Sequence, residues 1–177
     1  MALRAMRLNG TYPKTHLAAR RNENGGMNVD EASIIQYITS TFDGIETVTS
    51  KGNTFIFYGP DRKMPLATIV TTDEYDGFSD LDLPSVFRLN IGISKSTYRS
   101  LFGPKATHPD AASDGAGKHN FTALDHVMPH PIYGRMNWVC VLNPSATTFG
   151  TDVRPLIAEA VSLADGRHDR RASRRSD

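Results

Sequence analysis

Apolar residues recur at the spacing of one helix face in the first and last of three stretches that are predicted to be helices, which are residues 30–42, 95–102 and 151–165. The first two begin at Asp30 and Ser94, whose short polar side chains are suited to cap a helix. A glycine follows each of the three stretches and is expected to end it: Gly44, Gly103 and Gly166.

Between these stretches, apolar and polar residues alternate or β-branched and aromatic residues gather, which predicts strands at residues 45–50, 54–58, 66–72, 86–93 and 137–142. Short loops join most of these strands, so we expect antiparallel pairing. A short helical turn is expected over residues 121–128. The order of elements predicts an α+β fold: an antiparallel sheet of four to five strands with helices packed on one face.

The chain divides into three parts by its pattern. Residues 1–26 show no period and are expected to be a flexible N-terminal extension, although their arginines also suit a transit peptide or translated sequence upstream of a start at Met27. Residues 27–166 form the single α+β domain. Residues 167–177 carry five arginines and are expected to be a disordered basic tail.

Composition excludes several classes of protein. Hydrophobic residues make up 39% of the chain and charged residues 22%, so a hydrophobic core can form without disulfides or metal ions. The net charge of +1 gives no overall field toward nucleic acid or an anionic membrane. Cys140 is the single cysteine, so no internal disulfide can form and a reducing compartment is expected. Without a long apolar run, the sequence predicts a cytoplasmic protein with no membrane partner, for which nucleic acid is an unlikely partner.

Three longer stretches resemble a bacterial family known as domain of unknown function 6194: VFRLNIGISKSTYRSLFG, HNFTALDHVMPHPIYG and WVCVLNPS. The resemblance covers residues 27–164 and implies no established activity. The element order, with a late strand that carries Trp138 and a closing helix, is similar more distantly to MmcQ/YjbR-like proteins of the double-wing type. That resemblance implies a compact α+β fold and supplies no catalytic motif.

Histidines gather in one loop-rich segment. His119, Asp125 and His130 are candidate catalytic residues, because histidine and aspartate perform acid–base chemistry near neutral pH. Pro129 and Pro131 prevent a helical pair of histidines here, and no H-E-x-x-H or C-x-x-C is present, so we expect no metal and no cofactor. In the alternative interpretation, His130 only hydrogen-bonds the loop backbone.

Polar residues interrupt an otherwise apolar strand at Arg88 and Asn90. Together with Tyr133 and Trp138, they are candidate ligand-binding residues on a sheet face. The alternative is that Arg88 and Asn90 simply face water from the open side of an antiparallel sheet.

Other partial motifs are discounted. The acidic run at residues 76–82 lacks the spacing and the closing glutamate of a calcium loop. Residues 115–118 lack the first glycine and the hydroxyl of a phosphate-binding loop. Cys140 lies between two valines in a strand, where a thiol is usually inert, although a pair with His119 or His130 is conceivable.

Two functions from different classes fit the sequence. Because no catalytic motif is complete, we expect an accessory protein that binds a small molecule or a protein partner. The alternative is a small enzyme with a His/Asp acid–base or metal site in the loop of residues 119–130, and the sequence does not decide between them. Nucleic-acid binding through the arginine tail ranks last, because the loop of residues 73–82 is acidic.

Overall fold

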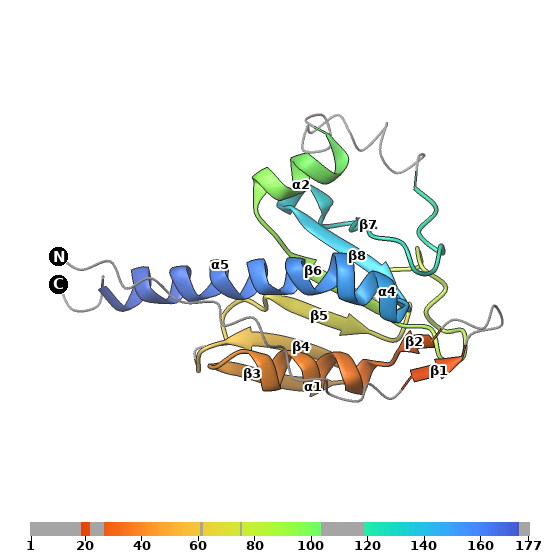
Figure 1. The fold of residues 1–177 in the computed structure, drawn as a ribbon, viewed down its shortest axis with the longest axis horizontal. Helices are drawn as coiled ribbons and strands as arrows, with labels where there is room; N and C mark the ends of the chain where they lie inside the picture. The colour runs from red at the N-terminus through yellow and green to blue at the C-terminus, as the bar shows by residue number, and fades with distance from the viewer. Residues whose placement is uncertain (1–18, 22–26, 61, 75, 104–118, 174–177) are drawn as a thin grey trace.

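The computed structural model describes residues 19–21, 27–60, 62–74, 76–103 and 119–173 (Figure 1). Its centre is a six-stranded open sheet in which every neighbouring pair is antiparallel. In spatial order the strands are β3 (Ile45–Ser50), β4 (Asn53–Tyr58), β5 (Ala67–Val70), β6 (Arg88–Gly92), β8 (Trp138–Leu142) and β7 (Met128–Pro129). A separate two-stranded ribbon joins β1 (Ala19–Arg21) to β2 (Met27–Val29). The α+β class and the antiparallel sheet are confirmed.

The sheet has one strand more than the sequence predicted. The expected helical turn over residues 121–128 is wrong: these residues form turns that lead into β7. Asp125 has a positive φ of 58°, and its amide donates to the carbonyl of Leu142 at 2.7 Å. The segment therefore follows the neighbouring strand β8, and Pro129 keeps the chain extended at the end of β7.

Helices cover one face of the sheet. They are α1 (Glu31–Thr41), α2 (Lys95–Phe102), the short α4 (Ala146–Thr148), a π-helical turn η3 (Phe149–Val153) and α5 (Arg154–Ser173). A separate 3-10 turn, η2 (Gly134–Met136), precedes β8. Figure 1 shows α1 and α5 crossing the same side of the sheet. Alternate strand residues such as Ile56, Ile69, Leu89, Val139 and Val141 pack beneath them in one buried core. This arrangement confirms the predicted amphipathic strands and leaves the opposite face of the sheet uncovered by α1 and α5.

Asp30 caps α1 as predicted: its Oδ1 accepts a hydrogen bond from the amide of Ser33 at 2.8 Å. Asp30→Ala is expected to lower the free energy of unfolding by about 1 kcal/mol, because an amide of the first turn loses its partner. Urea denaturation would measure the change. Thr39→Ala, an exposed change within the same helix, is the control and should leave stability nearly unchanged; equal effects of the two substitutions would contradict the cap.

Helix α5 does not end at Gly166, and residues 167–173 of the expected tail continue it. A glycine inside a helix costs only about 1 kcal/mol relative to alanine, which tertiary contacts can outweigh. Here the Tyr58 hydroxyl donates to Asp165 at 2.7 Å, and its ring lies 6.0 Å from that of His168. Contacts on both sides of Gly166 thus hold the helix against β4. Ala19–Arg21, within the expected N-terminal extension, forms strand β1.

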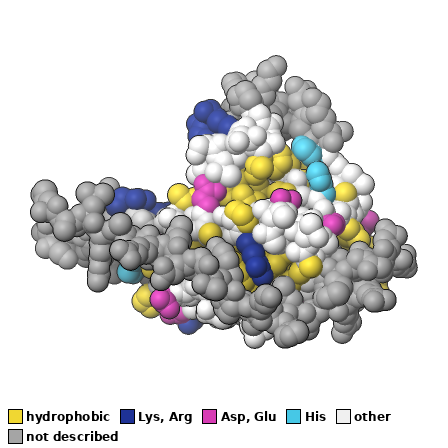
Figure 2. Space-filling model, viewed as in Figure 1, with side chains coloured by type: hydrophobic (Ala, Val, Ile, Leu, Met, Phe, Trp, Pro, Cys, Tyr) yellow, Lys and Arg dark blue, Asp and Glu magenta, His cyan; other side chains and the backbone are white. Residues whose placement is uncertain are grey.

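The charged surface is mixed. Figure 2 shows the side of the molecule seen in Figure 1, with basic and acidic side chains scattered over the coloured, described residues. Within the described ranges, no helix is long and apolar enough to cross a membrane.

Candidate functional site

The uncovered face of the sheet holds a cavity of about 380 Å³. Its floor comes from alternate residues of four strands, at positions opposite to those of the core: Asn53, Phe55, Thr68, Val70, Arg88, Asn90 and Trp138. Its walls come from three connecting segments: Met64, Pro65, Asp76, His130, Ile132, Tyr133 and Met136. Apolar side chains thus surround a small number of polar groups, which is typical of a small-molecule site.

A buried ion pair lies at the edge of this floor. The guanidinium of Arg88 donates to both carboxylate oxygens of Asp76, at 2.9 Å and 2.6 Å, and to the hydroxyl of Ser79 at 2.8 Å. The side chains of Arg88 and Asp76 are only 1% and 7% exposed. Burial alone would raise the pKa of the Asp76 carboxyl, but the hydrogen bonds and charge of Arg88 outweigh it and lower that pKa. Asp76 therefore stays ionised, and the charge of Arg88 is neutralised within the protein.

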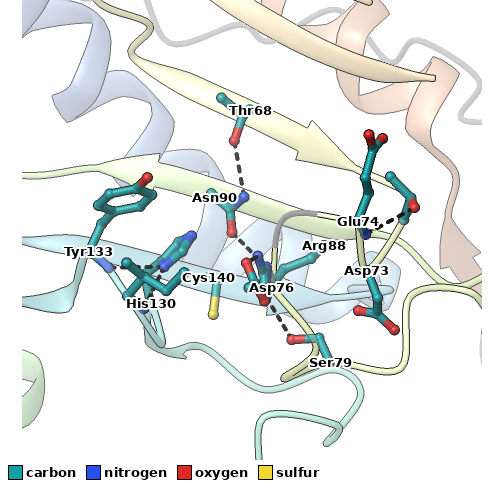
Figure 3. Close-up of polar contacts among 12 residues, drawn as sticks. Thr68, Asp73, Glu74, Asp76, Ser79, Arg88, Asn90, His130, Tyr133 and Cys140 are labelled. Carbon is teal, nitrogen blue, oxygen red and sulfur yellow. Dashed lines mark hydrogen bonds and ion pairs between the residues drawn. The ribbon is translucent and has the colours of Figure 1, made fainter. Parts of the chain in front are cut away.

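A directed chain of hydrogen bonds leads from this pair across the floor (Figure 3). Nε of Arg88 donates to Oδ1 of Asn90 at 3.0 Å, and Nδ2 of Asn90 donates to Oγ1 of Thr68 at 3.0 Å. Because a guanidinium can only donate, the amide of Asn90 must present its oxygen to Arg88 and its nitrogen to Thr68. The order of donors and acceptors in the chain is thereby fixed.

His130 also lines the cavity and is 5% exposed. Its Nδ1 accepts hydrogen bonds from the amides of Ile132 and Tyr133, both at 3.1 Å. Burial, followed by the charge of Arg88, lowers the pKa of His130 to about 4, while Asp76 acts in the opposite direction. Near neutral pH the ring is therefore uncharged and carries its proton on Nε2, which makes it a hydrogen-bond donor.

Aromatic rings complete the wall of the cavity. The indole of Trp138 lies against Gly92, where an added Cβ would approach it to 3.2 Å, so the glycine leaves the space that the indole occupies. Tyr133 is 50% exposed at the rim, with its ring 5.0 Å from that of His130.

The structure brings together five of the seven predicted site residues, since Arg88, Asn90, His130, Tyr133 and Trp138 all line the cavity. The alternative that Arg88 and Asn90 face water is wrong, because both are buried. The prediction that His130 bonds the loop backbone is confirmed.

His119 and Asp125, the other two candidates, are not among the residues that line the cavity. The ring of His119 lies 6.3 Å from Phe102 and 6.2 Å from Phe121. Oδ1 of Asp125 accepts the amide of Ser145 at 2.6 Å, which holds the turn before α4. The structure therefore assembles no His119–Asp125–His130 site around the cavity.

Residues of the discounted motifs either have structural roles or lie outside the residues that the structure describes. Cys140 is buried, its Sγ donates to the carbonyl of Pro129 at 3.6 Å, and burial raises its pKa to about 12. Asp76, from the acidic run, pairs with Arg88, and the described residues contain no group of three potential metal ligands. Residues 115–118 lie outside the described residues.

Sequence reasoning missed three polar residues of the cavity: Asn53, Thr68 and Asp76. Sequence reasoning could have found Thr68, because Thr68 pairs with Asn90 in the register of β5 and β6. Residues paired in this way lie on the same face of the sheet. Asp76 gave no such signal, because it lies in an irregular loop.

Comparison with known proteins gives a family and no activity. No curated protein and no solved structure matches the chain. The family model described as "Family of unknown function (DUF6194)" matches residues 27–173, which is most of the chain. The chain therefore belongs to the DUF6194 family.

Proposed function

We propose that this protein binds a small organic molecule in the cavity on the uncovered sheet face. The observation that carries the proposal is the construction of the cavity: buried polar groups of Arg88, Asn90 and His130 stand among apolar walls. Burying polar groups is costly unless each finds a partner, and here their positions are fixed by hydrogen bonds within the protein. Such fixed donors in an apolar cavity are suited to orient a ligand.

The arrangement favours binding over acid–base catalysis. Nδ1 of His130 already accepts two backbone amides, and Nε2 carries the proton, so neither nitrogen is available as a base. Of the other catalytic candidates, Asp125 is engaged with Ser145. Catalysis by His119, Asp125 and His130 thus stays a prediction without support from geometry, as do the likeness to MmcQ/YjbR-like proteins and a cytoplasmic location.

Filling the cavity tests the proposal. Val70 lines the cavity from β5, and Val70→Phe should weaken binding of the uncharged dye Prodan at least about tenfold by occupying its space. Binding is read by energy transfer from Trp138, the only tryptophan of the chain. Val48→Phe is a matched control, because Val48 lies on β3 opposite Phe55 and does not line the cavity. Equal Prodan affinity in the two variants would refute the proposed site.

A further inference from the structure

Several polar groups of the described cavity lining have a hydrogen to donate. The hydroxyl of Thr68 accepts from Asn90, so its own hydrogen must point elsewhere. Among the described residues, the hydroxyl of Thr68 takes part in no hydrogen bond besides the one from Asn90, although Thr68 is half-buried on the cavity floor. The hydroxyl hydrogen of Thr68 is therefore available to a bound molecule.

The chain that ends at Thr68 strengthens this donor. It begins at a buried cation, Arg88, and each group donates to the next: Arg88 to Asn90, and Asn90 to Thr68. Hydrogen bonds aligned in one direction polarise one another, most of all in a site of low dielectric constant. The alignment of these bonds thus makes the hydroxyl of Thr68 a better donor than an isolated threonine.

Two further donors line the same cavity. His130 carries a hydrogen on Nε2, because its Nδ1 accepts from the backbone. Asn53 is 1% exposed, and its Oδ1 accepts the amide of Thr71. Its Nδ2 has no hydrogen-bond partner within the part of the chain that the structure describes. Asp76, the one carboxylate among the described lining residues, is already paired with Arg88. A ligand that fits these groups must supply acceptors.

The charges of the lining favour an uncharged ligand. Among the described residues of the lining, Arg88 is the only lysine or arginine, and Asp76 neutralises it at 2.6 Å. An anionic ligand would lose its hydration without gaining a free cation, and it would meet the carboxylate of Asp76. A neutral carbonyl oxygen needs only donors, which the cavity provides.

We infer that the ligand is an uncharged, largely apolar molecule with a carbonyl-type oxygen, and that the hydroxyl of Thr68 donates to this oxygen. The inference rests on the proposed function, because it names the ligand of the same cavity.

Three probes of one shape test the inference: 2-acetylnaphthalene has a carbonyl, 2-ethylnaphthalene has none, and 2-naphthoate is an anion. Their affinities are measured by displacement of Prodan from the full chain. The acetyl probe should bind roughly three- to tenfold more tightly than the ethyl probe, as one additional hydrogen bond allows. The naphthoate should bind no better than the acetyl probe.

Thr68→Val and Thr68→Ser distinguish the effect of the hydroxyl on binding from an effect of the substitution on the fold. The valine variant keeps the shape and should bring the ratio of acetyl to ethyl affinity to about one, while the serine variant keeps the hydroxyl and should keep the ratio. The emission of bound Prodan, whose carbonyl responds to hydrogen bonding, should shift to the blue in Thr68→Val only. An unchanged affinity ratio and emission in Thr68→Val, or tightest binding by naphthoate, would overturn the inference.

The measurements distinguish a wrong ligand class from a wrong binding site. If the site is wrong, Prodan binding is absent or insensitive to Val70→Phe, and all comparisons among the probes lose their basis. If only the inference is wrong, Val70→Phe still weakens Prodan binding, and Thr68→Val leaves the order of the three probes as it is in the unmodified chain.

Discussion

Replacement of Arg88 by methionine is expected to lower the free energy of unfolding by about 3–5 kcal/mol, because it leaves the carboxylate of Asp76 buried without its partner. The loss includes the hydrogen bonds to Ser79 and Asn90, since the same guanidinium makes both. Single domains have stabilities of about 5–15 kcal/mol, so this loss removes a large part of the stability of the domain. Urea denaturation followed by Trp138 emission would measure the change.

The matched control for Arg88→Met is Arg62→Met. Arg62 pairs with Glu46 at 2.7 Å, but the two side chains are 55% and 34% exposed. An exposed pair contributes about 0–1 kcal/mol, so this variant should remain nearly as stable as the original. A double variant, Arg88→Met with Asp76→Leu, removes both buried charges and should regain much of the lost stability. Similar losses in Arg88→Met and Arg62→Met would show that the pair is not buried in solution.

The central strands and the face of the candidate site were predictable from periodicity. Alternation through residues 86–93 places Arg88 and Asn90 on one face of the sheet and Leu89 on the other. The same rule places Trp138 and Val139 on different faces. Because side chains of a strand point to two faces only, the order of residues determines which face is polar and which is apolar. The register of β5 against β6 then adds Thr68 beside Asn90.

The remainder depends on tertiary contacts that have no period. Asp76 reaches Arg88 from an irregular loop, and Asp125 is held by Ser145 on another segment. Strand β7 has two residues, which is too short for alternation to indicate it. The extension of α5 past Gly166 depends on Tyr58, which is remote in the sequence. Each of these features is fixed by a partner distant along the chain, and a local pattern does not identify that partner.

Acidification is expected to destabilise the fold through His130 before it affects Asp76. The pKa of His130 is about 4 in the folded chain, against an ordinary value of 6.5. Between these pH values the unfolded chain binds the proton and the folded chain does not, so the free energy of unfolding decreases as pH falls. The stabilisation is fully present above about pH 6.5 and is lost toward pH 4. The lowered pKa of Asp76 adds a second loss, which begins only below its ordinary value of 3.8.

Two effects lower the pKa of His130. Burial disfavours the charged ring, and the charge of Arg88 adds to this effect. A protonated ring would also carry a hydrogen on Nδ1, which could then no longer accept the amides of Ile132 and Tyr133. A pKa difference of this size corresponds to roughly 3 kcal/mol of stability lost across the interval.

His130→Asn isolates this contribution. An asparagine oxygen can accept an amide two residues ahead, so the turn is retained, but the side chain does not titrate. Urea denaturation between pH 7 and pH 4 should therefore show a weaker dependence on pH in this variant. His126→Asn changes an exposed histidine in the same segment and should keep the original dependence. If His130→Asn keeps the original dependence as well, the ring of His130 is not held neutral by burial, and its role as a fixed donor in the cavity is contradicted.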